Sequence, residues 1–268
     1  MKPDRVRERR DYSGGANPDF QVFLLLGQSN MEGAPEPESQ DLVQNDRVRV
    51  LAYDDCPNLG RRYGQWDTAA PPLHSCSAGV GPGDTFGRRM AEAHPEAIIG
   101  LVPCAISGVD IDFFRKGVVS ARRSEFRIPP DDHWSGAYAW VIERARLAQE
   151  VGVIRGLLFH QGESDSTDPA WPGKVAEIVS DLRADLGLGE SAPFLAGELL
   201  HTGSCSAHNV RIAELPGLIP NADVVSASGL AGMDPHHFDL AAQRELGNRY
   251  ATSMRSRLSL PLAASSLA

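Results

Sequence analysis

The chain of 268 residues has no long hydrophobic run, and none of its apolar segments approaches the roughly 18 residues that a membrane-spanning helix needs. It also has no excess of positive charge, because 35 acidic residues outnumber 26 basic ones and leave a net charge of −9. We therefore expect neither nucleic acid nor a membrane as a partner, and a neutral substrate suits this surface better. Internal repeats and interdomain linkers are also absent from the sequence, so its length predicts one large domain.

Cysteine is scarce, with only Cys56, Cys76, Cys104 and Cys205 in the chain. No two of them have C-x-x-C spacing, which argues against a zinc site or a thioredoxin-type site. We expect no metal and no cofactor. Cys104 lies in an apolar run that predicts a small core residue. Cys56 and Cys76 flank a loop-rich stretch and can pair if the protein is exported, which the sequence leaves open.

The N-terminal segment MKPDRVRERRDYSGGANPD is too long and too mixed in charge for the start of a signal peptide. We predict a flexible arm over residues 1–19, a single domain over 20–256 and a disordered tail over 257–268. Because no signal peptide is visible, a cytoplasmic protein and a trimmed secreted form both remain open.

Apolar runs alternate with helical patterns along the domain. Strands are predicted at 20–26, 47–53, 97–105, 154–160, 193–200 and 222–228. Helices are predicted at 84–94, 136–150, 172–187, 206–216 and 239–254, the last with Asp239 as its N-cap. The strand runs are continuous rather than alternating, which is typical of strands buried on both faces, so we predict an α/β fold with a mainly parallel sheet. The loops at 54–80 and 106–133 are long enough to be functional or mobile.

A serine stands where the first predicted strand ends, in the stretch FLLLGQSNMEG. Ligands of open α/β sheets bind outside the carboxyl ends of the strands, which places Ser29 at such a site. A hydroxyl needs a base to become a nucleophile. The best candidate pair is Asp234 and His237 in GMDPHHFD, where a tight turn can let the carboxylate orient the imidazole. His236 is the rival histidine, and a turn without catalytic function is the structural alternative.

Two further polar turns follow the same pattern. The segment LLFHQGESD at 157–165 offers the amide of Gln161, which suits an oxyanion donor, and the carboxylate of Glu163. The segment GVGPGDTFG at 79–87 is a glycine-rich loop that opens a helix, and Gly81 can supply a backbone N–H there. This loop lacks the lysine of a P-loop and the spacing of a dinucleotide fingerprint.

Four motifs in this order carry a family resemblance: GQSNM (27–31), GVGPGDTFG (79–87), HQGESD (160–165) and DPHHFD (234–239). Together they resemble the SGNH (GDSL-type) hydrolase superfamily, and within it the carbohydrate esterases of family 6 and the sialate O-acetylesterase-like domains. The resemblance spans roughly residues 20–252. It implies a three-layer α/β/α sandwich with a flavodoxin-like, mainly parallel sheet, no metal, and ester hydrolysis through an acyl-enzyme.

The resemblance also implies roles for single residues. It makes Ser29 the nucleophile and a backbone donor to the oxyanion, with Gly81 as the second donor and Gly83 as the alternative register. Gln161 matches the third donor.

In the last motif, Asp234 and His237 match the remaining two members of the triad. The Pro235-His236 pair departs from the commoner form, so His236 remains the competing base. Glu163 matches a carboxylate to which the resemblance assigns no role.

The expected activity is removal of O-acetyl groups from a carbohydrate such as acetylxylan or a xylo-oligosaccharide. The alternatives are a sugar O-acyltransferase that uses the same site, a carbohydrate-binding domain with a relic site, and a flavodoxin-like nucleotide binder. Trp66 and Trp134 lie in long loops and are expected to form a wall for the sugar, whereas Trp140 is expected in the core. The sugar and the oligomeric state stay open at this point.

Overall fold

The computed structural model describes residues 16–131 and 133–259 of the chain. Within this part the strands form one seven-stranded sheet in the order β3-β2-β4-β1-β5-β6-β7. The strands are β1 (Asn17–Gly27), β2 (Val48–Leu51), β3 (Trp66–Thr68), β4 (Ile98–Ala105), β5 (Gly152–His160), β6 (Phe194–Gly197) and β7 (Ala222–Val225). Every pair of neighbours is parallel except β2 and β3, which are antiparallel.

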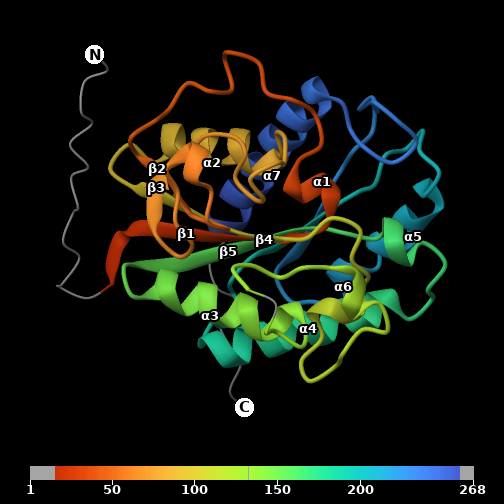
Figure 1. Ribbon diagram of the computed structural model, residues 1–268. Coiled ribbons are helices and arrows are strands. Elements are labelled where there is room, and N and C mark those ends of the chain that lie inside the picture. Colours follow the sequence, from red (N-terminus) through yellow and green to blue (C-terminus); the bar gives the residue numbers. More distant parts are fainter. Residues whose placement is uncertain (1–15, 132, 260–268) are drawn as a thin grey trace.

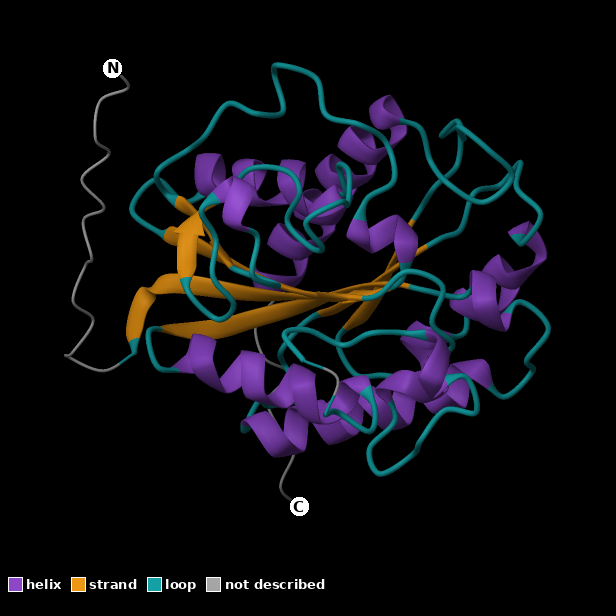
Figure 2. Ribbon diagram, in the orientation of Figure 1, coloured by secondary structure: helices purple, strands orange, loops and turns teal. Residues whose placement is uncertain are grey.

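Helices cover both faces of this sheet, as Figures 1 and 2 show. The α-helices are α1 (Ser29–Glu32), α2 (Pro82–Ala93), α3 (Ala137–Gln149), α4 (Trp171–Leu186), α5 (Asn209–Ile212), α6 (Leu215–Leu218) and α7 (Leu240–Ser259). Short 3₁₀ turns lie at Pro57–Leu59, Ile111–Phe114, Arg123–Glu125, Glu163–Asp165 and Ser206–His208. Helices α2 and α7 pack side by side on one face, and α3 and α4 cover the other (Figure 1). The predicted three-layer α/β/α fold is confirmed.

The differences from the predicted elements have local causes. Strand β3 was not predicted, because it is only three residues long and lies inside the loop expected at 54–80. The single helix expected at 206–216 is a 3₁₀ turn followed by α5 and α6. Pro216 lacks the N–H group that would continue one helix through this segment.

The ends of the described chain also differ slightly from the predicted boundaries. Strand β1 begins at Asn17, inside the expected arm, and α7 continues to Ser259, beyond the expected domain end at 256. The rest of the expected arm and tail, residues 1–15 and 260–268, lies outside the described residues. None of the described helices is both long enough and apolar enough to cross a bilayer.

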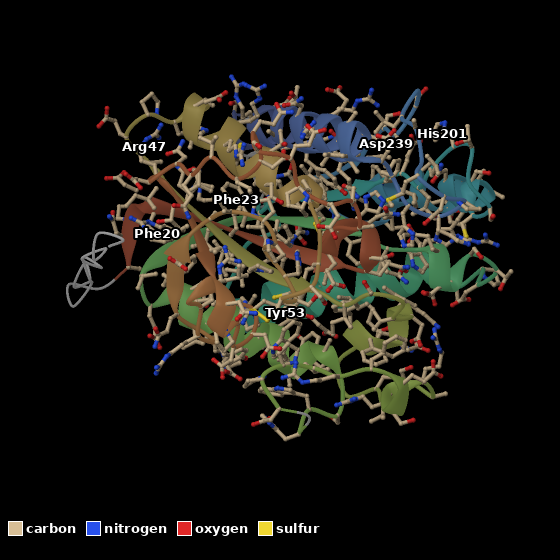
Figure 3. The ribbon with its side chains drawn as sticks, turned by 45° about the horizontal axis from the view of Figure 1, so that its top comes forward. Phe20, Phe23, Arg47, Tyr53, His201 and Asp239 are labelled. Atoms are coloured by element: carbon tan, nitrogen blue, oxygen red, sulfur yellow. A yellow bond between two sulfur atoms is a disulfide. The ribbon has the colours of Figure 1, made fainter. Side chains whose placement is uncertain are left out.

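Strand β1 lies at the centre of the core and is buried on both faces. Phe20, Val22 and Leu24 belong to the apolar cluster under α3 and α4, whereas Phe23 and Leu25 belong to the cluster under α2 and α7. This division follows from the alternation of side chains along a strand, and Figure 3 labels Phe20 and Phe23 on β1. Burial on both faces explains why the strand sequences read as continuous apolar runs.

The register of β1 brings three polar turns to one edge of the sheet. Gly27 is paired with Ala105 of β4 on one side and with His160 of β5 on the other. The residues that follow Gly27, Ala105 and His160 therefore leave the sheet side by side at its carboxyl edge. Gly27 has φ +136°, and a Cβ atom there would lie 2.1 Å from the carbonyl oxygen of His160. Only glycine fits this position.

A disulfide closes the first long loop. Cys56 and Cys76 are joined with their Cα atoms 5.6 Å apart, and the bond fastens the end of the segment that leads to residues 77–81. Cys104 is a free, buried cysteine of β4, in agreement with the predicted core position. Cys205 is free and partly exposed.

Gly27→Ala should destabilise the fold by about 2–4 kcal/mol, because the new methyl group has neither the conformation nor the space it needs. Chemical denaturation measures this free energy of unfolding. Gly173→Ala, in helix α4, is the matched control, since a Cβ atom at that position would meet no atom within 4 Å beyond the backbone of its own helix. That control should change stability by less than about 1 kcal/mol, toward greater stability. Equal effects of the two substitutions would contradict the close approach of β1 and β5.

Candidate active site

A cleft of about 800 Å³ lies at the carboxyl edge of the sheet. Its walls come from the turns after β1, β4 and β5, from the segment next to the disulfide, and from the loop before α7. The lining residues are Gln28, Ser29, Glu32, Gly33, Ala34, Ser75, Ser77, Ala78, Ser107, Gly108, Glu163, Ser164, His236 and His237. Polar side chains and small residues dominate this set.

Ser29, His237 and Asp234 form a hydrogen-bonded chain in the cleft. The Oγ of Ser29 lies 3.0 Å from Nε2 of His237, and Nδ1 of His237 lies 2.7 Å from Oδ2 of Asp234. This is the geometry in which an imidazole can take a proton from the serine while the carboxylate stabilises the imidazolium. The His237 and Asp234 side chains are 30% and 41% exposed, so water reaches these hydrogen-bonded side chains.

The loop that carries Asp234 and His237 is held by its own hydrogen bonds. Oδ1 of Asp234 accepts from the backbone N–H groups of His236 at 2.7 Å and His237 at 2.8 Å. The hydrogen bond with the His237 imidazole, together with those from the two backbone N–H groups, lowers the pKa of Asp234 to about 2. Asp234 therefore remains a carboxylate throughout the neutral range.

The predicted N-cap of α7 is confirmed, since Oδ1 of Asp239 accepts from the N–H of Ala242 at 2.8 Å.

His236 also lines the cleft, but it has a different neighbour. Its Nδ1 lies 3.8 Å from Sγ of Cys205, and its carbonyl oxygen accepts from Asn30. The structure thus places His237, and not the competing His236, between Ser29 and Asp234.

The completely buried side chain of Asn30 ties the histidine loop to the serine turn. Its Nδ2 donates to the carbonyl of His236 at 2.9 Å, and its Oδ1 accepts from the N–H of Phe238 at 3.2 Å. One side-chain amide thus forms hydrogen bonds with the backbone of both residues next to His237. The second Nδ2 hydrogen is directed to Oε1 of Glu163, at 2.6 Å. The sequence did not reveal this role of Asn30, although the residue stands next to the serine in the GQSNM motif.

Glu163 is the carboxylate that fixes the orientation of the Asn30 amide. Burial raises its pKa, and the hydrogen bond from Asn30 opposes that shift. Its Oε2 is buried and has no hydrogen-bond partner among the described residues. The sequence assigned no role to Glu163. In the structure its contact with Asn30 gives it a positioning role.

Comparison with known families identifies the family to which the chain belongs. The family model described as "Carbohydrate esterase, sialic acid-specific acetylesterase" matches residues 19–256. The chain belongs to this family. The esterase is 30% identical over 249 residues to the probable carbohydrate esterase At4g34215 of Arabidopsis thaliana, an alignment that covers 86% of this chain and 88% of the plant protein. It is accordingly a carboxylic ester hydrolase.

Solved structures agree on the fold. The X-ray structure of the Arabidopsis thaliana protein matches the esterase with a TM-score of 0.71 at 26% identity, covering 90% of this chain and 99% of that one. NanS matches with a TM-score of 0.68 at 19% identity, covering 90% and 98%. XAC1771, a carbohydrate acetylesterase from Xanthomonas citri, matches with a TM-score of 0.64 at 18% identity, covering 88% of this chain and 56% of that one.

The structure does not place Gln161 in the cleft of the esterase, although the sequence predicted an oxyanion donor there. Its side chain is buried, and its Nε2 donates to the carbonyl of Val109 at 3.2 Å and to the carboxylate of Asp165. Its Oε1 accepts from Nε1 of Trp171 at 2.6 Å. The amide is fully used in fastening the turn after β5 to α4, so we withdraw the oxyanion role.

The two glycines predicted as donors also lie elsewhere. Gly81 is the N-cap of α2, and a Cβ atom there would lie 2.5 Å from the carbonyl oxygen of Met31. A Cβ atom on Gly83 would meet the side chain of Leu25 at 2.7 Å. Both glycines pack behind the serine turn, and neither lines the cleft.

Ser107 and Gly108 lie at the cleft of Ser29 instead. They follow β4, the neighbour of β1, and both line the cleft. Gly108 has φ +76°, and its N–H makes no hydrogen bond to any described residue. The sequence assigned them only to a long loop, because the side-by-side position of β4 and β1 was not visible in it.

The expected tryptophan wall is also absent from the cleft lining. Trp66 lies in β3 and packs edge-on against Phe20, with ring centroids 4.9 Å apart. Trp134 packs against the core and stacks near His133 at 4.2 Å. Trp140 is fully buried, as predicted.

Among residues 16–131 and 133–259, no group of three or more His, Cys, Asp or Glu side chains is arranged to hold a metal ion.

Asn30→Ala should lower the rate of ester hydrolysis by about 10- to 100-fold, because His237 loses the contact that fixes its position. It should also destabilise the protein by about 2–5 kcal/mol, since it leaves buried polar groups unpaired. Rates on 4-nitrophenyl acetate and thermal unfolding test the two effects.

Asn45→Ala is the control for Asn30, because its side chain accepts one backbone hydrogen bond just before β2, at the other edge of the sheet. It should leave the rate unchanged and cost about 1 kcal/mol or less. An unchanged kcat in Asn30→Ala would show that the hydrogen bonds of Asn30 to His236 and Phe238 do not position His237.

Proposed function

We propose that the protein is a serine esterase that removes O-acetyl groups from a carbohydrate through an acyl-enzyme, with acetylated xylan or xylo-oligosaccharides as the candidate substrates. The 3.0 Å contact between Ser29 Oγ and His237 Nε2, continued to Asp234, is the observation that carries the proposal. The many hydroxyl, amide and carboxylate groups of the cleft supply hydrogen bonds that suit a sugar.

Ser29, His237 and Asp234 each have one role in this mechanism. His237 takes the proton of Ser29 as the serine oxygen attacks the acetyl carbonyl. The imidazolium, held by Asp234, then gives this proton to the departing sugar oxygen. Water attacks the acetyl-serine in the second half-reaction, with His237 again as the base, and acetate leaves.

The negative charge that develops on the carbonyl oxygen requires donors close to Ser29. Ser29 is the first residue of α1, and the first N–H groups of a helix have no partner within it. The N–H of Gly108 makes no hydrogen bond to a described residue, and Gly108 lines the same cleft as Ser29. We assign the N–H groups of Ser29 and Gly108 as the oxyanion donors, in place of Gly81 and Gln161.

The openness of the cleft favours hydrolysis over acyl transfer. Transfer to a second sugar requires that water be kept away from the acyl-enzyme, whereas here His237 and Asp234 are both exposed to solvent.

Ser29→Ala should reduce kcat for acetate release by about a million-fold, while the protein stays folded. Acetate released from acetylated xylo-oligosaccharides and 4-nitrophenol released from its acetate ester are the two readouts. Ser253→Ala serves as the control, because that hydroxyl binds Asp223, a residue of β7 that does not line the cleft. If Ser29→Ala turns over at a near-normal rate, Ser29 is not the nucleophile.

His237→Ala should be nearly as damaging as the serine substitution, because the two side chains act as a unit. His236→Ala should retain most of kcat, since that ring lies outside the chain from Ser29 to Asp234. Steady-state kinetics of both variants on 4-nitrophenyl acetate rank the two histidines. The opposite ranking would assign the general base to His236.

A further inference from the structure

Apart from its two histidines, the ionisable side chains on the cleft wall are acidic. Glu32 and Glu163 are its two carboxylates, and no lysine or arginine is among the lining residues. Arg122 reaches the rim, where it donates to the carbonyl of Gly108 at 3.0 Å, but it is paired with Glu125 and does not line the cleft. A ligand that carries a carboxylate would therefore meet no cationic side chain on this wall, apart from a protonated histidine.

Glu32 is held rigidly beside the nucleophile. It is 7% exposed, and its Oε2 accepts from the backbone N–H of Ser107 at 2.8 Å and from the Ser107 hydroxyl. Its Oε1 makes no hydrogen bond to a described residue, and no described lysine or arginine forms an ion pair with the side chain. Because Ser29 and Glu32 are three residues apart in α1, they project from the same face, with Cβ atoms about 5–6 Å apart.

We infer that Glu32 is a specificity-determining residue: its free oxygen accepts a hydroxyl hydrogen bond from a neutral acetylated sugar, and its charge excludes acetylated sugars that carry a carboxylate. The inference rests on the proposed esterase function, because it concerns the sugar bound next to Ser29. It departs from the family description, which names sialic acid, a sugar acid with a carboxylate of its own.

Simple electrostatics gives the expected size of the discrimination. At an effective dielectric constant of about 20, two like charges about 7 Å apart repel enough to weaken binding by roughly 10- to 100-fold. Ions in the buffer reduce this repulsion where water enters the cleft. The discrimination should therefore shrink as salt is added.

A matched pair of substrates tests the inference: an O-acetylated methyl glucoside and the corresponding O-acetylated methyl glucuronoside, which differ in a CH₂OH group and a carboxylate. The wild-type esterase should hydrolyse the neutral sugar with a kcat/KM at least about 10-fold higher, and the ratio should fall with rising salt. In Glu32→Gln, which retains an acceptor for Ser107, the ratio should fall toward one through a gain on the anionic substrate. Reading a ratio within each variant removes any change in overall rate or in the amount of folded enzyme.

Glu96→Gln is the control for the loss of one negative charge. Glu96 is exposed and comes just before β4, at the edge of the sheet opposite the cleft, so its loss should leave the substrate ratio unchanged. Equal kcat/KM of the wild-type enzyme on the two sugars, or an unchanged ratio in Glu32→Gln, would overturn the inference and leave the esterase function intact. Hydrolysis of 4-nitrophenyl acetate without hydrolysis of either sugar would also overturn it. Failure of all three substrates would instead reject the proposed function.

Discussion

The parallel register of β1 with β4 and β5 is the constraint on which the rest of the site depends. By pairing Gly27 with Ala105 and His160, it brings three chain segments distant in sequence to one edge of the sheet. In Figure 3, Arg47, which comes just before β2, lies toward the left side of the molecule, whereas Asp239, just before α7, lies toward its right side. The register is fixed by burial of β1 on both faces, since a shift by one residue would exchange its two sets of core side chains.

The serine turn is fixed on that scaffold by polar contacts rather than by a long helix. Helix α1 has only four residues, and its side chains make the contacts that hold the site together: Asn30 reaches the histidine loop and Glu163, and Glu32 reaches Ser107. One turn of helix thus connects the wall after β4, the wall after β5 and the loop before α7. Such a network keeps reacting groups in place without a rearrangement during the reaction, which is the condition for electrostatic stabilisation of a transition state.

The sequence predicted those features that depend on local pattern. Continuous apolar runs revealed six strands of the sheet, and the D-x-x-H spacing identified a turn in which Asp234 can hold His237. It could not predict which strands are neighbours, and Gly108 lines the cleft with Ser29 only because β4 lies beside β1. The oxyanion role predicted for Gln161 failed for a related reason. Its side-chain amide forms hydrogen bonds with Asp165 and Trp171, and only the path of the following turn and helix places these residues beside it. Trp66 was expected at the cleft because it lies in a long loop, yet three residues of that loop form an edge strand that packs it on Phe20.

The proposed mechanism depends most on covalent acetylation of Ser29. Rapid mixing of the esterase with excess 4-nitrophenyl acetate, an acid quench and mass spectrometry of the digested protein would locate the intermediate directly. The mechanism predicts one added acetyl group on the peptide that contains Ser29, formed at the rate of the initial burst and lost again once the ester is consumed. Turnover with no acetyl group on that peptide, or an acetyl group on another residue that forms and decays at the rate of turnover, would contradict it.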